Sequence, residues 1–173
     1  MLLDRTLITE LLHDLAHRLA LTGQPAAIRL VGGAAIAVGY FDRRATLDID
    51  AVYHPGDLVE RVAAEIAAER GLPADWLNNH ALGFVPFVGQ DEWTELFTYG
   101  PITVFVASAP MLLAMKLAAN RGLRDSGDIE GLLRTCGVTS VEQAQAIYET
   151  YHAQGVLSPS AQARVRALLE RYG

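Results

Sequence analysis

Leucines recur every three or four residues close to the start of the chain and predict an amphipathic helix over residues 5–21. This helix ends before Gly23 and Pro25, which both interrupt a helical pattern. A short apolar run at 28–31 then leads into Gly32-Gly33, which is typical of a buried strand entering a tight turn. Small residues at 34–39 favour a short helix that packs closely against its neighbours.

The segment 46–53 reads TLDIDAVY and alternates between apolar and polar positions. This period of two predicts a half-buried strand with Leu47, Ile49 and Ala51 on its inner face. A turn at 55–57 precedes a second amphipathic helix, which extends over residues 58–70 and ends at a glycine.

The middle of the chain is less regular. Residues 72–92 contain scattered prolines and glycines, and we expect a loop with short elements there. Two apolar segments at 94–99 and 102–107 are separated by Gly100-Pro101 and predict a β-hairpin.

The last third of the chain is predicted to be helical. Helices are expected from Ser108 to about Leu123, from near Asp125, from a capping box at 139–142, and from Ser158-Pro159. Strands and helices mix without regular βαβ alternation, which favours an α+β fold with a small mixed sheet, an N-terminal helix and a helical C-terminal third. We expect residues 1–108 to form an α/β core and residues 109–173 to pack on it, in a single compact unit.

Composition narrows the classes of partner. The chain has 173 residues, 51% of them apolar, and a formal charge of −6, which excludes a broad basic surface for nucleic acid; we expect no DNA partner. No apolar run reaches the roughly 18 residues of a membrane span, and the N-terminal segment resembles neither a signal sequence nor an anchor, so no membrane partner is expected. The single cysteine, Cys136, fits a reducing cytoplasm and excludes an internal disulfide.

The distribution of cations is unusual, because Lys116 is the one lysine beside thirteen arginines. On its predicted helix, Lys116 emerges from a largely apolar sector, where a charge is costly without a partner. A compact ammonium there suits a point contact with phosphate; the alternative is a side chain that snorkels to water. His13 and His17 have helical spacing but lack the glutamate of a zinc-protease helix, and we expect them on a helix surface.

Two carboxylates and a glycine pair carry the clearest chemical signal. Asp48 and Asp50 project from one face of the predicted strand, about 7 Å apart, and their repulsion is costly unless a cation lies between them. Oxygen ligands of this kind suit Mg²⁺ that is shared with substrate phosphates. Backbone N–H groups at Gly32-Gly33, at the start of a helix, favour an anion. Together they indicate a metal-bound triphosphate; separately they are a tight turn and a solvated strand face.

The sequence here resembles a known family. The residues that carry the resemblance are Gly32-Gly33, then Arg44-Ala-Thr46-Leu-Asp48-Ile-Asp50, then Lys116 followed by Arg124-Asp125-Ser-Gly-Asp128-Ile129. They look like the DNA polymerase β-like nucleotidyltransferase superfamily, and within it most like the toxin nucleotidyltransferases of AbiE-type and MenT-like type IV toxin–antitoxin systems. The likeness extends over residues 28–133.

The resemblance implies a Mg²⁺-dependent cytoplasmic nucleotidyltransferase that moves a nucleotide from an NTP to an acceptor hydroxyl, such as the 3′ end of a tRNA. It further implies a toxin that a cognate antitoxin restrains. Asp48 and Asp50 would bind Mg²⁺, Lys116 would contact a phosphate or the nucleotide, and Asp128, with Asp125 as the alternative, would complete the catalytic set. The nucleotide would lie against Gly32, Gly33, Ala34, Arg44, Thr46 and Lys116, with Ala34 where many relatives have a hydroxyl residue.

The sequence departs from the family pattern at one point, because the segment 102–106 has no acid where many relatives carry a third carboxylate. Glu95 or Asp128 could serve as the general base instead. Alternatives are a nucleotidyltransferase that modifies an aminoglycoside or a protein, a non-catalytic nucleotide-binding module of the same fold, and a helical interaction protein. Candidate acceptor contacts are Arg43, Arg44, Arg121, Arg124 and Arg134, with Trp76, Trp93, Phe84 and Phe87 as stacking residues.

Overall fold

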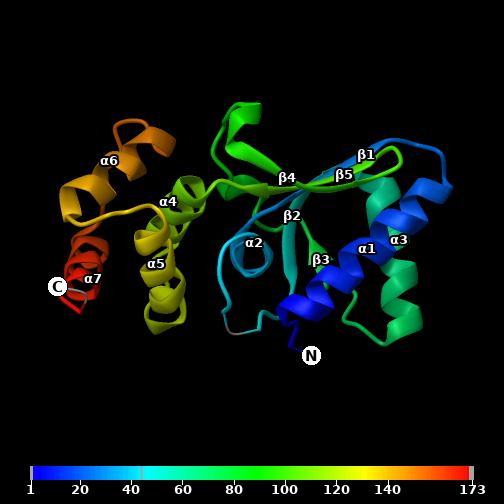
Figure 1. The fold of residues 1–173 in the computed structure, drawn as a ribbon, viewed down its shortest axis with the longest axis horizontal. Coiled ribbons are helices and arrows are strands. Elements are labelled where there is room, and N and C mark those ends of the chain that lie inside the picture. Colours follow the sequence, from blue (N-terminus) through cyan, green and yellow to red (C-terminus); the bar gives the residue numbers. More distant parts are fainter. Residues whose placement is uncertain (1, 44, 172–173) are drawn as a thin grey trace. The chain divides into compact units, whose positions relative to one another are not determined.

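A computed structural model describes residues 2–43 and 45–171 of the chain (Figure 1). Within these residues the chain forms seven α-helices and a five-stranded mixed sheet, which confirms the α+β fold class. The elements are α1 (Arg5–Leu21), β1 (Ala26–Leu30), α2 (Gly32–Gly39), β2 (Ile49–His54), α3 (Gly56–Arg70), β3 (Leu77–Asn78), β4 (Trp93–Tyr99), β5 (Ile102–Ala107), α4 (Ala109–Ala119), α5 (Leu123–Thr135), α6 (Val141–Tyr151) and α7 (Pro159–Leu169), with short 3₁₀ turns at Leu82–Phe84 and Gln90–Glu92.

The chain divides into two compact units. Unit 1 comprises Met1–Gly83 and Trp93–Ala107, and unit 2 comprises Phe84–Glu92 and Ser108–Gly173. The chain leaves unit 1 for the last time between Ala107 and Ser108, one residue before the boundary expected between residues 108 and 109. Residues 84–92, which the sequence pattern assigned to the core, group with the C-terminal helices.

The sheet belongs to unit 1 and has the order β3-β2-β1-β5-β4. Its central strand, β1, runs parallel to β5 and antiparallel to β2. The expected hairpin forms from β4 and β5, which pair antiparallel from Trp93↔Ala107 to Tyr99↔Ile102. A register shift between Glu95 and Phe97 marks a β-bulge, which reverses the alternation of side chains along β4.

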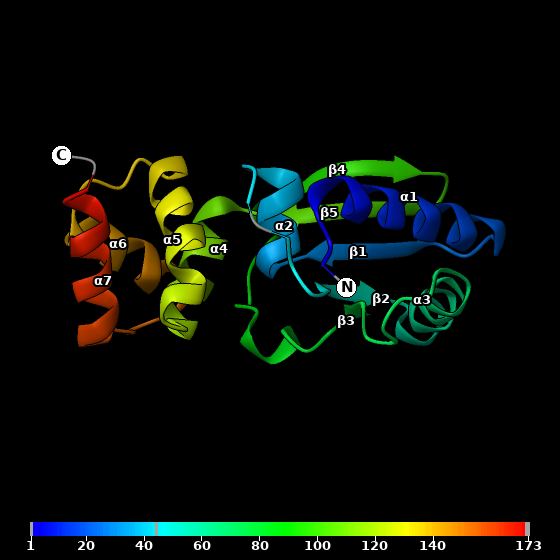
Figure 2. The ribbon, with the colours of Figure 1, turned by 90° about the horizontal axis from the view of Figure 1, so that it is seen from below.

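One face of the sheet is covered by α1, α2 and α3 (Figures 1 and 2). Alternate strand residues point into this layer and are fully buried, among them Ile28, Leu30 and Val104. Helix α1 contacts both α2 and α3, and Arg18 of α1 bridges to Glu69 of α3 with nitrogen and oxygen 2.6 Å apart. The core of unit 1 therefore lies between these helices and one side of the sheet.

The strand that carries the candidate carboxylates begins later than predicted. Residues Thr46 and Leu3 exchange two backbone hydrogen bonds, of 2.7 and 2.9 Å, which draw the chain away from the sheet before β2 starts at Ile49. Leu47 is consequently 57% exposed, and its predicted inward position was wrong. Ile49 and Ala51 are fully buried as expected.

Unit 2 contains α4 to α7. Ser108, Ser140 and Ser158 cap the starts of α4, α6 and α7, because each side chain accepts a hydrogen bond from a first-turn N–H. Helix α4 ends at Ala119 rather than near Leu123, since Asn120 adopts a positive φ of 42°. No helix within the described residues is both long and apolar enough to cross a membrane.

Burial on α1 gives a direct test of the core. We expect Leu15→Ala, at a fully buried position facing the sheet layer, to lower the free energy of unfolding by about 2–5 kcal/mol through lost contacts and a cavity. Leu21→Ala, at a 76% exposed position of the same helix, is the matched control and should change it by less than about 0.5 kcal/mol. Urea titrations followed by circular dichroism measure both, and equal losses would contradict the assigned core.

Candidate functional site

The turn from β1 into α2 requires glycine. Gly32 has a φ of +65°, and a Cβ built on it would lie 2.9 Å from Oδ2 of Asp50. Any larger residue would therefore be strained by its backbone and would also displace the Asp50 carboxylate. The preceding N-cap residue, Val31, has no polar side chain to cap the helix, so first-turn N–H groups of α2 face this turn without a side-chain cap.

Gly33 brings the same backbone close to a cation and a hydroxyl. A Cβ on Gly33 would collide with Nη1 of Arg43 and would lie 3.3 Å from Oγ1 of Thr46. The positive end of the α2 dipole and the Arg43 guanidinium thus lie at one place, and both favour an anion there. Ala34, the next predicted nucleotide contact, is fully buried, so it presents no accessible surface to a ligand. The predicted contact Arg44 lies outside the described residues.

The two predicted carboxylates bracket the start of β2. Asp50 belongs to β2 and Asp48 lies in the bend directly before it, and both are partly buried. Asp50 alternates with the buried Ile49 and Ala51, so it projects from the side of the strand opposite the helices. Asn78 of β3, which is 5% exposed, donates from Nδ2 to Oδ2 of Asp48 at 3.3 Å and so orients that carboxylate.

The donor set of this turn fits a magnesium ion in part. Two carboxylates are the number that Mg²⁺ often takes from a protein when phosphate oxygens and water supply the remaining ligands. No group of three His, Cys, Asp or Glu side chains suited to hold a metal occurs among residues 2–43 and 45–171. The residues present therefore suit an ion shared with a substrate and not one enclosed by the protein alone.

Lys116 forms a buried ion triad in unit 2. Its Nζ lies 2.9 Å from Oδ1 of Asp125 and 2.9 Å from Oδ2 of Asp128, and the lysine side chain is 8% exposed. The lysine was expected to need a partner in its apolar sector, and these two carboxylates of α5 provide it. The triad ties α4 to α5. The contact of Lys116 with a nucleotide and the catalytic role of Asp128 remain predictions from the resemblance.

Asp125 is the best-bonded member of the triad. It also accepts hydrogen bonds from the backbone N–H of Arg121 at 2.9 Å and from Nε of Arg121 at 3.2 Å. Burial by itself would raise the pKa of Asp125, but the hydrogen bonds from Lys116 and Arg121 outweigh it and lower the pKa to about 2. Asp125 is thus held ionised as a structural acid.

The predicted stacking residues differ in their surroundings. Trp76 is fully buried and donates from Nε1 to the carbonyl of Ala63 at 2.9 Å, so it belongs to the core. Trp93 is partly exposed on β4, whereas Phe84 and Phe87 of unit 2 are 77% and 109% exposed.

Several remaining candidates have structural partners. His13 stacks on Phe97 with ring centroids 4.0 Å apart, which agrees with a helix-surface role and not with a metal site. Arg134 pairs with Glu130 along α5. Burial raises the pKa of the Cys136 thiol to about 11, so this cysteine is unreactive at neutral pH.

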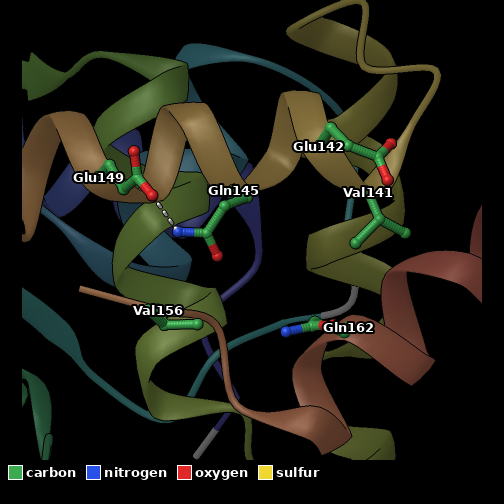
Figure 3. Close-up of a pocket in the computed structure, with 6 residues that line it drawn as sticks. All are labelled: Val141, Glu142, Gln145, Glu149, Val156 and Gln162. Carbon is green, nitrogen blue, oxygen red and sulfur yellow. Dashed lines mark hydrogen bonds between the residues drawn. The ribbon is translucent and has the colours of Figure 1, made fainter. Parts of the chain in front are cut away.

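A hollow of about 360 Å³ in unit 2 lies between α6 and α7 (Figure 3). Its main polar side chain, Gln145, donates to Glu149 at 2.7 Å and to the carbonyl of Gly155 at 2.9 Å. Gln145 therefore fastens the loop after α6. The lining residues are Val141, Glu142, Gln145, Glu149, Val156 and Gln162, none of which the sequence analysis had proposed.

The sequence analysis did not identify Asn78 as a partner of Asp48, and it did not place Arg43 beside Gly33. Neither has a sequence signal, because Asn78 reaches Asp48 through the pairing of β2 with β3 and Arg43 reaches Gly33 through the loop after α2. Unit 1 thus brings together Gly32, Gly33, Thr46, Asp48 and Asp50, and unit 2 brings together Lys116, Asp125 and Asp128.

No protein-family model, curated protein or solved structure matches the chain. The resemblance described above is therefore carried by the quoted residues alone.

Lys116 and Arg121 both pair with Asp125, and we expect their removal to lower the stability of the protein by different amounts. Lys116→Met leaves two buried carboxylates without their lysine and should lower the free energy of unfolding by about 3–5 kcal/mol. Arg121→Met also removes a partner of Asp125, but the Arg121 side chain is 52% exposed, and the loss should stay below about 1 kcal/mol. Chemical denaturation measures both variants, and similar losses would show that burial does not set the strength of the triad.

The lowered pKa of Asp125 predicts a pH dependence with a definite sign. A carboxyl whose pKa is lower in the folded than in the unfolded protein stabilises above the unfolded value, about 4, and this contribution is lost as the pH falls through about 2. The difference in unfolding free energy between wild type and Asp125→Asn should therefore narrow from pH 6 to pH 2. Glu170→Gln, at an exposed position, is the control with no such trend. A constant difference for Asp125→Asn would contradict the assignment.

Proposed function

We propose that the protein is a nucleotidyltransferase whose nucleotide-binding site is the turn at Gly32-Gly33 in unit 1. The observation that carries the proposal is the contact of this turn with both kinds of charge. A Cβ on Gly32 would meet the Asp50 carboxylate, and a Cβ on Gly33 would meet the Arg43 guanidinium. A phosphate at the start of α2 would thus find backbone N–H donors, a cation, and carboxylates able to share a metal ion.

Asp48 and Asp50 would hold the metal ion. When bound, Mg²⁺ would neutralise phosphate charge and favour departure of pyrophosphate. The other contacts come from the chain itself. N–H groups at the start of α2 would fix the phosphates, Thr46 Oγ1 lies beside Gly33 to orient them, and Asn78 holds the Asp48 carboxylate in place.

In the proposed reaction the acceptor hydroxyl oxygen attacks the α-phosphorus of an NTP. A new oxygen–phosphorus bond forms, the bond to the bridging oxygen breaks, and pyrophosphate leaves with its electron pair. The hydroxyl proton needs an acceptor. Of the two candidate bases, Asp128 already forms an ion pair with Lys116 in unit 2, and Glu95 lies on β4, three strands from β2 in the sheet order. We therefore propose that a water molecule accepts the proton.

The resemblance extends the proposal to partners. We propose an RNA acceptor, such as the 3′ end of a tRNA, a cytoplasmic site of action, and a cognate antitoxin as the protein partner. An aminoglycoside or a protein side chain is the alternative acceptor within the same chemistry.

The second candidate is a nucleotide-binding module without turnover. The observation that favours it is the triad of unit 2, in which Lys116 already contacts Asp125 and Asp128 at 2.9 Å. If these charges serve only to join α4 to α5, the site in unit 1 lacks the lysine that the resemblance assigns to it.

A transfer assay separates these functions. Purified protein is incubated with Mg²⁺ and each α-labelled NTP, in parallel with total tRNA, an aminoglycoside mixture and total protein as acceptors. We expect label on tRNA, and a loss of at least about 100-fold for Asp48→Asn and for Asp50→Asn, because removal of a preorganised charge commonly costs that much. Asp57→Asn, at an exposed acid in the first turn of α3, is the matched control.

Each outcome points to one candidate. Label on the aminoglycoside or the protein alone would replace RNA as the acceptor. Nucleotide binding in equilibrium dialysis, with no transfer to any acceptor, would favour the non-catalytic module. Equal transfer by wild type and Asp48→Asn would overturn the proposed metal ligands.

A further inference from the structure

The face of the sheet opposite α1, α2 and α3 carries its own cluster of side chains. None of the helices α1, α2 and α3 lies over this face (Figures 1 and 2). The strand register places Val52, Arg29, Phe105 and Glu95 in one row across four strands, from β2 to β4. Val52, Arg29 and Phe105 lie at positions that alternate with buried ones, and all four residues are at least partly exposed.

Arg29 and two aromatic rings form the centre of this face. The guanidinium carbon of Arg29 lies 5.2 Å from the ring centroid of Phe105 and 5.9 Å from that of Trp93, within cation–π range of both. Trp93 precedes Glu95 by two residues on β4, in the direction of the β1 end that leads to Gly32. We call Arg29, Trp93 and Phe105 the aromatic platform.

We propose that the aromatic platform binds single-stranded RNA by stacking its bases. The proposal deepens the function proposed above, on which it rests for the role of the bound strand as the acceptor. Aromatic rings and a planar guanidinium on a sheet face are a surface on which unpaired bases stack, whatever their sequence. Arg29 is also the one arginine or lysine among the described strand residues of this face, and its planar guanidinium extends the stacking surface of the two rings.

The chemistry beside the platform favours RNA over DNA. Glu95, opposite Phe105, accepts a hydrogen bond from Oγ1 of Thr98 at 3.0 Å, and Thr98 lies 3.2 Å from Oγ1 of Thr103. A carboxylate repels phosphate but accepts a hydrogen bond from a ribose 2′-hydroxyl, which DNA lacks. The row of polar groups thus suits the sugar edge of an RNA strand whose bases lie on the platform.

The platform also lies at a suitable distance from the candidate carboxylates. Asp50 precedes Val52 by two residues on β2, and Val52 pairs with Arg29. Two residues along a strand span roughly 7 Å, which is about the length of two successive base-stacking steps. A strand lying on the platform can therefore direct its end toward Asp50.

The test measures binding without NTP or Mg²⁺, so that it does not depend on catalysis. The probe is a labelled eight-nucleotide RNA of alternating adenine and cytosine, compared with the DNA of the same sequence and with AMP, by fluorescence anisotropy and competition. We expect the RNA to bind more tightly than either.

Variants assign the binding to the platform. Trp93→Leu or Phe105→Leu should weaken RNA binding by about 5- to 150-fold, the range found for loss of one stacked base, and Trp93→Phe should restore it. Phe97→Leu is the matched control, because Phe97 lies on the same strand but stacks on His13 in the helix layer. RNA should also quench the fluorescence of Trp93 and leave that of the buried Trp76 unchanged.

Three results would overturn the proposal: no binding of the RNA, binding that Trp93→Leu and Phe105→Leu leave unchanged, or equal affinity for the DNA. Failure of the proposed function gives a different pattern. RNA would then bind the platform while the transfer assay shows no labelled acceptor.

Discussion

The structure of unit 1 depends on the burial of only one face of its sheet. Helices α1, α2 and α3 form a single layer, and strands β1, β2 and β5 direct their small and branched apolar residues toward it. Because side chains alternate along a strand, the same constraint turns the intervening residues to the opposite side. Asp50, Arg29, Phe105 and Glu95 all come from such positions, so the chemical groups of four strands share one surface.

The turn after the central strand converts this arrangement into a site. Gly32 permits the backbone to enter α2 directly beside Asp50, and Gly33 permits Arg43 to approach the start of the helix. The helix dipole and two side chains of opposite charge therefore meet at the end of β1. A residue with a side chain at either glycine would separate these groups.

The sequence pattern predicted the fold class and most helices, because their apolar periodicity is local. It placed both Asp48 and Asp50 on one strand, whereas only Asp50 belongs to β2 and Asp48 lies in the bend before it. It failed for Leu47, since the pairing of Thr46 with Leu3 joins residues far apart in the chain. Alternation alone would likewise place Trp93 and Phe97 on one side of β4, but the bulge between Glu95 and Phe97 sends them to opposite faces. Arg29 became a candidate only once the strand register was known.

The burial of the sole lysine has a consequence for the chemistry of the whole surface. Every other basic side chain is an arginine or a histidine, and Lys116 is held between two carboxylates in the interior of unit 2. Amine-directed modification, whether acetylation, ubiquitin conjugation or cross-linking, therefore meets no accessible lysine side chain while α4 and α5 stay together. The reactivity of that one amine reports on the opening of unit 2.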